Sequence, residues 1–268
     1  MRPKKATAIT LPVDRDAGGR ASDALSAGVE EEALPLPRHE AWQSGAMAMF
    51  SVIFEVHPKQ EKVDLYLDLA MRLRPVLEGI DGFVDNERFE SSRRPGWILS
   101  HSTWRDEKSV VRWRTVAQHH DTQQRGRDEV FQDYHLRVGE IVADTAPPPG
   151  ASIVEQRLDE TEIGVAKFAT LTEVQPGSSE VHIASAAALP DSLLLDRHAS
   201  DLIDYDVFAS IYNQGKLALL VSWRDRLSAE RFKPRLFAGI STRHRIVRVV
   251  RDYGMFDRRE SPQYYPAI

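Results

Sequence analysis

From Phe50 onward, the hydrophobic positions of the chain alternate between the period of a strand and the period of a helix. Residues 50–56 (FSVIFEV) are β-branched and aromatic, and Pro58 follows them, so this stretch predicts a strand that ends near the proline. The next apolar residues recur at steps of three and four, on one face of a helix: Val63, Leu67, Ala70, Leu73 and Leu77. Pro75 and Gly79 predict the end of this helix.

The same unit continues with a hairpin, a second helix and a final strand. Residues 82–91 (GFVDNERFES) and 97–104 (WILSHSTW) alternate as strands around the turn RRPG. Asp106 is the expected N-cap of a helix that carries Val110, Val111 and Trp113. Residues 134–144 supply a last strand, so the order is βαββαβ, which is that of a ferredoxin-like unit.

The βαββαβ pattern occurs twice in the sequence. EVHP at residues 55–58 returns as EVQP at residues 173–176, and the triplet Trp-Arg-Asp occurs at Trp104 and again at Trp223. Both pairs have the same spacing to within one residue, which indicates a repeat. The second copy is shorter between its Trp-Arg-Asp triplet and its last strand, expected at residues 249–252.

The repeat predicts an α+β fold in which two tandem ferredoxin-like βαββαβ units form a dimeric α+β barrel within one chain, as an intrachain pseudo-dimer. A single unit has helices on one face of its sheet, so its other face needs a partner. We expect an irregular N-terminal arm at residues 1–48, the first unit at 49–146, and a second, eroded unit with a C-terminal extension at 147–268. The Pro-rich stretch TAPPPG marks the boundary. A cavity between sheet and helices is expected to hold a small ligand.

The amino-acid composition limits the kinds of partner that the protein is expected to bind. The 268 residues include 35 basic and 40 acidic side chains, and the net charge of −5 gives no electrostatic footprint for nucleic acid. The absence of cysteine excludes disulfides, thiolate metal sites and cysteine nucleophiles. No apolar run approaches the roughly 20 residues that span a bilayer, and no secretory signal is recognisable. We therefore expect a cytoplasmic protein that binds a small-molecule substrate, with neither nucleic acid nor membrane as partner and with homo-oligomers left open.

At these residues the first unit resembles the antibiotic biosynthesis monooxygenase family, whose members are dimeric α+β barrels and include heme-degrading monooxygenases. The resemblance covers residues 50–145 and rests on FEVHP, YLDLAMRLRPVLEGIDGF, STWRDE, the Trp113-Arg114 pair, His119, QQRGR and FQDYHLRV. The second copy is looser, although VRDYGMFDRRE at residues 250–260 resembles the family's C-terminal extension. The family spans oxygenation of aromatic polyketides, quinone chemistry and heme chemistry, so the resemblance implies the fold more strongly than the reaction.

The candidate active site lies in residues 113–127 (WRTVAQHHDTQQRGR), the segment that the second copy lacks. His119 and His120 are about 100° apart on a helix, so only one is expected to face the pocket. That histidine can serve as an axial iron ligand or as a general base. Trp113 can stack on an aromatic substrate. The more common roles of such residues, a surface histidine and a core tryptophan, remain open.

The resemblance also implies a set of substrate-binding residues. In cofactor-free family members, Asn, Trp, Tyr or Arg side chains hold a substrate enolate or phenolate that reacts directly with oxygen, which implies Asn86, Trp113 and Arg125 here. Asn86 and His101, both on the hairpin strands, are expected to point at the cavity. In heme-degrading relatives the iron-binding histidine lies after the helix tryptophan, about one turn further along than His119, where this chain has Gln123. This departure weakens the heme assignment.

The leading functional hypothesis is an oxygenase of a small aromatic or polyketide-like substrate that uses no nucleotide cofactor. The sequence has no GxGxxG, Walker or GxSxG motif and no histidine spacing of a metal site. One alternative is a heme-binding enzyme in which His119 or His120, or a histidine of the second copy such as His198, reaches the iron. Another is a non-catalytic barrel that binds a small ligand. The cofactor is therefore expected to be either none or heme.

Overall fold

Strands form a closed barrel at the centre of the computed structural model, which describes residues 45–176 and 185–262. The order around the barrel is β10-β5-β2-β4-β3-β8-β9-β7, and the paired strands are antiparallel. The first half contains β1 (Gly45–Met47), β2 (Phe50–Pro58), α1 (Val63–Glu78), β3 (Phe83–Ser91), β4 (Ile98–Trp104), α2 (Glu107–Thr115), α3 (Ala117–Arg125) and β5 (Phe131–Asp144). The second half contains β6 (Ala151–Ile153), β7 (Phe168–Pro176), α4 (Leu189–Ser192), β8 (Leu202–Ser210), β9 (Leu217–Trp223), α5 (Arg226–Arg231) and β10 (Ile240–Gly254). The expected α+β class is confirmed.

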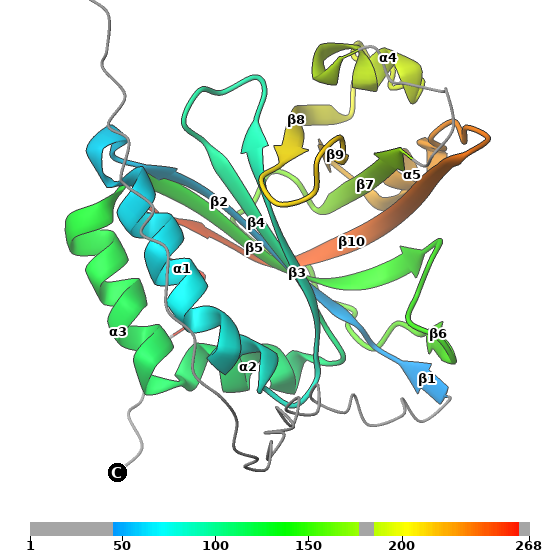
Figure 1. The fold of residues 1–268 in the computed structure, drawn as a ribbon. Coiled ribbons are helices and arrows are strands. Elements are labelled where there is room, and N and C mark those ends of the chain that lie inside the picture. Colours follow the sequence, from blue (N-terminus) through cyan, green and yellow to red (C-terminus); the bar gives the residue numbers. More distant parts are fainter. Residues whose placement is uncertain (1–44, 177–184, 263–268) are drawn as a thin grey trace, which may run out of the picture. The chain divides into compact units, whose positions relative to one another are not determined.

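The two halves arrange their four barrel strands in the same way. Around the barrel, the first half is β5-β2-β4-β3 and the second is β10-β7-β9-β8, so each half places its last strand beside its first and its third beside its second. The halves join where β10 pairs with β5 and where β3 pairs with β8. In Figure 1, α1, α2 and α3 lie together against the strands of the first half, and α4 and α5 lie near those of the second.

The repeated Trp-Arg-Asp triplets have a structural reason. Asp106 caps α2 by accepting a hydrogen bond from the Ser109 backbone N–H at 2.7 Å, and Asp225 caps α5 by accepting one from Ser228 at 2.8 Å. Such a cap satisfies a donor that the first turn of a helix leaves free. The tryptophan that precedes each cap is buried. The triplet therefore ends a strand, places an aromatic ring in the core and starts a helix.

Several element boundaries differ from the expectation. The helix α1 ends at Glu78, directly before the expected stop at Gly79, but Pro75 lies inside it and does not end it. The strand β10 is much longer than residues 249–252. The expected helix after Asp106 breaks in two at Val116, whose backbone is extended. Just before the break, the Thr115 hydroxyl donates to the carbonyls of Val111 and Arg112, both at 3.0 Å, in competition with the helical pattern.

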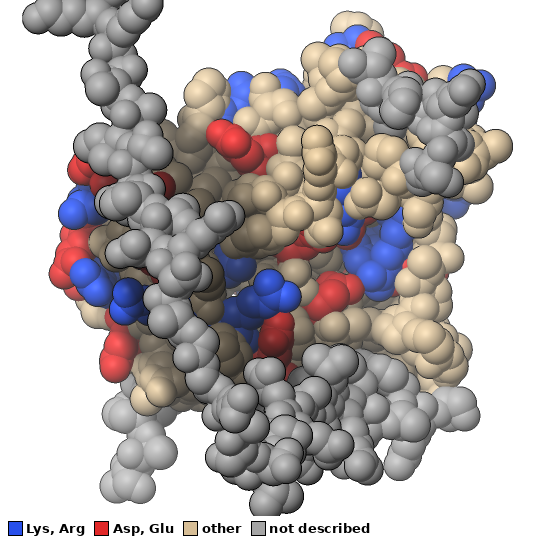
Figure 2. Space-filling view, viewed as in Figure 1, with Lys and Arg blue, Asp and Glu red and all other residues tan. Residues whose placement is uncertain are grey.

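The expected N-terminal arm lies mostly outside the described residues. Its end is ordered into β1, which pairs in parallel with β6. No helix among the described residues is long and apolar enough to cross a membrane. On the face shown in Figure 2, positive and negative side chains are interspersed among uncharged ones.

The interior of the barrel combines an apolar belt with buried ion pairs. Ile53, Phe89, Leu171 and Phe208 are among the buried residues of the belt. Glu55 pairs with Arg137 and Glu173 pairs with Arg245, and all four side chains are at least nine-tenths buried. Each arginine is the cross-strand neighbour of an apolar residue on the first strand of its half, Ile53 or Leu171. The two halves thus place one buried carboxylate–guanidinium pair each at matching positions.

The helix-facing sides of the two halves are filled differently. In the second half, Leu189 and Leu193 from the α4 region and Phe232, which follows α5, pack into a continuous apolar core against the strands. In the first half, the longer helices leave an open cavity above the strands. Residues of α2 and α3 line this cavity, and α5, the helix that follows β9 in the second half, is shorter.

Acid is expected to destabilise this fold well before its carboxylates protonate. Burial lowers the pKa of His101, His119 and His244 to about 4, against 6.5 in an exposed histidine. The unfolded chain therefore binds more protons than the folded one below pH 6.5, and the free energy of unfolding should fall as the pH drops from about 6.5 to 4. For the fully buried His101 the loss is on the order of 3 kcal/mol.

Urea denaturation at a series of pH values measures this loss. His101→Gln, whose amide does not titrate, should show a shallower pH dependence than the unmodified chain. Stability that stays constant or rises on acidification through this window would contradict the placement of these histidines.

Candidate active site

The cavity lies between the three helices of the first half and the outer face of β2–β5. Its volume is about 790 Å³. The apolar part of its wall comes from α1, α2 and the strands and includes Val52, Leu69, Leu73, Leu77, Val110 and Leu136. The helical spacing of α1 and the two-residue alternation of β2 direct these side chains to one side, where they enclose a space large enough for a small organic molecule.

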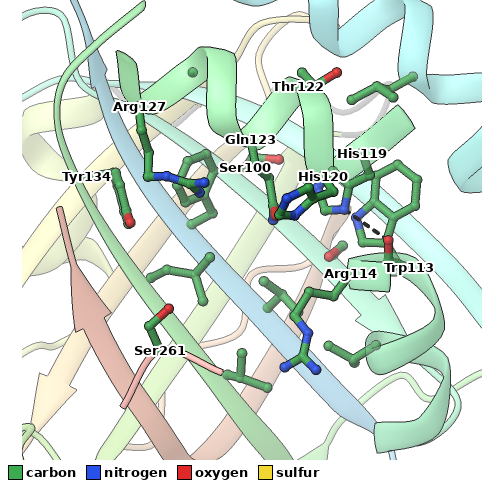
Figure 3. Close-up of a pocket in the computed structure, with 18 of the residues that line it drawn as sticks. Ser100, Trp113, Arg114, His119, His120, Thr122, Gln123, Arg127, Tyr134 and Ser261 are labelled. Carbon is green, nitrogen blue, oxygen red and sulfur yellow. Dashed lines mark hydrogen bonds between the residues drawn. The ribbon is translucent and has the colours of Figure 1, made fainter. Parts of the chain in front are cut away.

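Most of the residues expected from the sequence meet in this cavity. Trp113, His119, His120 and Asn86 all line it, as does Gln123. Figure 3 shows Trp113 and the two histidines on neighbouring helical turns at one side of the cavity. The expectation that only one of the two histidines faces the pocket is wrong, because the cavity wall extends around α3 from His119 to Gln123 and beyond.

Arg125 and His101 do not reach the cavity. Arg125 lies on the exposed side of α3, where its Nε donates to Glu129 at 3.0 Å one turn later. His101 points into the barrel, because successive residues of a strand face opposite sides; its neighbours Ser100 and Ser102 line the cavity, while its ring bonds to the Ser51 hydroxyl at 2.8 Å.

Trp113 and His119 form a fixed pair in the cavity wall. Their rings stack with centroids 3.9 Å apart and planes 15° apart. The Nδ1 of His119 lies 3.0 Å from the carbonyl oxygen of Trp113, and since a carbonyl only accepts, this geometry assigns the proton to Nδ1. Burial lowers the pKa of His119 to about 4. At neutral pH the ring is therefore uncharged, and its Nε2 remains free to accept a proton or a hydrogen bond.

A second polar group lies on the β3 side of the cavity. The side-chain amide of Asn86 donates to the His101 carbonyl at 2.8 Å and its oxygen accepts from Arg88 at 3.1 Å, so Asn86 holds Arg88 in place. The Nε of Arg88 is buried without a hydrogen-bond partner among the described residues. The hydroxyl of Tyr66 lies beside the Arg88 guanidinium: burial raises the pKa of Tyr66, and the charge and hydrogen bonding of Arg88 oppose this with a smaller effect. Both donors line the cavity and are available to an oxygen atom of a ligand.

Sequence reasoning missed these two donors, although a signal was present. Tyr66 occupies the same helical face as Ala70, Leu73 and Leu77, and Arg88 is two residues from Asn86 on one strand. Both spacings place the side chains on the cavity side.

The cavity is electropositive. Apart from histidine and tyrosine, the ionisable residues in the described part of its lining include one carboxylate, Glu107, which is paired with Arg157 at 2.6 Å. Against it stand six arginines: Arg88, Arg114, Arg127, Arg251, Arg258 and Arg259. The last three come from β10 and the residues after it, in the second half of the chain.

The described residues contain no cluster of three or more His, Cys, Asp or Glu side chains that would hold a metal ion. For a heme, the stacked Trp113 covers one face of the His119 ring and Nδ1 is already bonded, which leaves Nε2 as the one ring atom for ligation. Nothing else in the described part of the cavity wall distinguishes a heme site.

Comparison with known proteins points to one family. The family model described as antibiotic biosynthesis monooxygenase matches residues 49–125. A curated relative from Pyricularia oryzae, named jasmonate monooxygenase ABM, is 41% identical over 222 residues, which cover 81% of this chain and 99% of the relative.

Solved structures are similar to this chain only at low sequence identity. The crystal structure of an aldoxime dehydratase covers 76% of this chain and 81% of its own, at 11% identity and a TM-score of 0.47. A conserved protein from Methanosarcina mazei Go1 covers 34% of this chain and 91% of its own, at 16% identity and a TM-score of 0.32.

Proposed function

We propose that this chain, which belongs to the antibiotic biosynthesis monooxygenase family, oxidises a small, mostly apolar organic substrate with dioxygen in the first-half cavity and uses no nucleotide cofactor. One observation carries the proposal: an apolar cavity of about 790 Å³ has a neutral histidine, stacked on a tryptophan, in its wall. Such an arrangement can orient a planar substrate and accept its proton in the same place.

The residues of the cavity support a short reaction sequence. The Nε2 of His119 accepts a proton from an acidic C–H or O–H of the substrate, and the substrate anion formed beside the ring stabilises the imidazolium that burial alone disfavours. Tyr66 and Arg88, which lie beside each other in the cavity wall, stabilise the enolate or phenolate oxygen that results. Dioxygen adds to the activated carbon, and the hydroperoxide loses water to leave a carbonyl. Conversion of CH₂ to C=O consumes one dioxygen and releases one water, and the substrate supplies all four electrons, so no external reductant is needed.

Two substrate classes deserve testing first. Small aromatic or polyketide-like phenols are expected from the family, and Trp113 offers them a stacking surface. Jasmonate is the second, because the curated relative is named a jasmonate monooxygenase. The comparisons do not favour a heme enzyme or a non-catalytic barrel.

We also propose that the barrel is an intrachain pseudo-dimer of two ferredoxin-like units. Three features support this: the matching strand order of the halves, the matching caps Asp106 and Asp225, and the matching buried pairs Glu55–Arg137 and Glu173–Arg245. In this proposal the helix-facing side of the second unit is filled by an apolar core, and its strands complete the barrel with those of the first unit.

Oxygen uptake by the purified chain tests the proposed reaction. With a reactive substrate, we expect one dioxygen consumed per substrate oxidised in the absence of NADH, NADPH and flavin, and no increase when they are added. Uptake that starts only after a reduced cofactor is supplied would contradict the cofactor-free reaction. Absence of uptake with phenols, quinols and jasmonic acid alike would contradict the monooxygenase itself.

A further inference from the structure

We propose that the β10 side of the cavity binds the carboxylate group of the substrate through Arg114, Arg251 and Tyr253. The natural substrate is then the anion of a hydrophobic acid. This inference rests on the proposed function only in placing the substrate in the same cavity. It names the substrate class and the residues that select it.

The first support is the position of these residues. The strand order β10-β5-β2-β4-β3 puts β10 at one side of the cavity and β3 at the other. Arg251 and Tyr253 are on β10, and Arg114 is on α2, and all three line the cavity. The site with Asn86 and Arg88 on β3 is therefore separated from this one by the width of three strands. A substrate can be held at both ends, with its apolar body across the strands between them.

The second support is the lack of internal partners. Among the described residues, no carboxylate lies within ion-pair distance of Arg114 or Arg251, and the Nε of Arg114 is buried without any hydrogen-bond partner. Outside the cavity, Arg112 on the same helix is paired with Asp81 at 3.1 Å. A buried guanidinium without an acceptor costs free energy, and an anionic ligand removes that cost. In Figure 3 the Arg114 guanidinium extends from α2 into the open space of the cavity.

The third support is the environment of Tyr253. Burial raises the pKa of its hydroxyl to about 12, in spite of the neighbouring positive charges of Arg114, Arg251 and Arg258. The hydroxyl thus stays protonated and can donate to an anion. Arg258 also donates to the Tyr134 hydroxyl, so this side of the cavity gathers phenolic and guanidinium donors.

The apolar wall decides which anion is bound. Leucine and valine side chains of α1 and α2 cover much of the cavity, so the ligand must bury a largely hydrocarbon body. A singly charged carboxylate matches a planar guanidinium in geometry and leaves the rest of the molecule apolar. The second half of the chain thus contributes to the first-half cavity, because Arg251 and Tyr253 come from β10. Both residues lie outside the family match at residues 49–125.

Binding of a matched acid and ester tests the inference. The probe pair is 1-naphthaleneacetate and its methyl ester, which differ in charge and hardly in shape, measured by calorimetry at low and moderate salt. We expect the acid to bind at least roughly tenfold more tightly than the ester, and Arg114→Met or Arg251→Met to remove most of that preference while ester binding stays unchanged. Arg114→Lys, which keeps the charge, should retain part of it.

Arg112→Met is the matched control, because it removes an exposed guanidinium from the same helix outside the cavity; its preference should equal that of the unmodified chain. Equal affinity for acid and ester, absence of acid binding, or a preference that survives both methionine variants would overturn the inference. The measurement requires no turnover. If the chain binds the acid selectively but never consumes oxygen, the proposed function alone is contradicted. If it oxidises neutral substrates and shows no preference for the acid, this inference alone is contradicted.

Discussion

Trp113→Ala is expected to lower kcat/KM by roughly a hundredfold or more while the protein remains folded. The indole of Trp113 stacks on His119 at 3.9 Å, and its removal lets the imidazole rotate away from the orientation in which Nε2 can accept a proton. The cavity wall also loses its largest flat surface, so a planar substrate is held less firmly. Steady-state oxygen uptake measures the rate, and circular dichroism with a thermal melt measures the fold.

Two further variants test whether the aromatic face of Trp113, rather than the loss of a large side chain in general, is responsible for the effect. Trp113→Phe keeps an aromatic face and should recover a substantial part of the activity. Trp97→Ala removes a tryptophan that stacks on His57 at 5.3 Å and does not line the cavity, so its kcat/KM should stay near that of the unmodified chain. If Trp113→Ala retained full turnover, α2 would have no place in the active site.

Arg245→Met is expected to destabilise the folded chain by about 3 kcal/mol or more. Arg245 is 1% exposed and pairs with Glu173. Burial raises the pKa of Glu173, but the neighbouring positive charges, led by that of Arg245, outweigh burial and lower it to about 2. Loss of the guanidinium leaves a buried, charged carboxylate. Lys216, 2.6 Å from Glu173, still neutralises part of it, which keeps the expected loss at the lower end of the range for buried pairs.

Guanidinium chloride denaturation measures the loss, and a second change tests its cause. Adding Glu173→Gln to Arg245→Met removes the unpaired charge and should restore part of the lost stability. Arg74→Met breaks an exposed pair with Glu78 and should cost less than about 1 kcal/mol. Equal losses for Arg245→Met and Arg74→Met would show that the barrel interior does not hold the Arg245–Glu173 pair in a buried, charged state.

The fold could be predicted from the sequence where a local pattern decides it. The strand at Phe50, the apolar face of α1 and the cap at Asp106 each depend on residues a few positions apart, and the repeat at Trp104 and Trp223 revealed the second half. Boundaries set by tertiary contacts were less accessible. The length of β10 depends on its pairing with both β5 and β7, and such long-range pairing leaves no periodic mark in the sequence.

The candidate site was predicted in part for the same reason. Trp113, His119 and His120 are neighbours on two consecutive helices, so their spacing placed them together. Arg125 has the right residue type but the wrong helical face, and its spacing to Glu129, four residues later, was the available signal for a surface pair. Arg251 and Tyr253 could not be assigned at all, because only closure of the barrel brings β10 beside the first-half cavity.

Oxygen-18 labelling tests the central claim, that the first-half cavity oxygenates an organic substrate directly with dioxygen. Purified protein, free of nicotinamide and flavin, is mixed with a substrate identified by oxygen uptake under oxygen-18 gas, and the product is analysed by mass spectrometry alongside the Trp113→Ala variant. The account predicts a product with one labelled oxygen atom from the unmodified protein and little or none from the variant. A product whose oxygen comes from water, or equal labelling by both proteins, would contradict it.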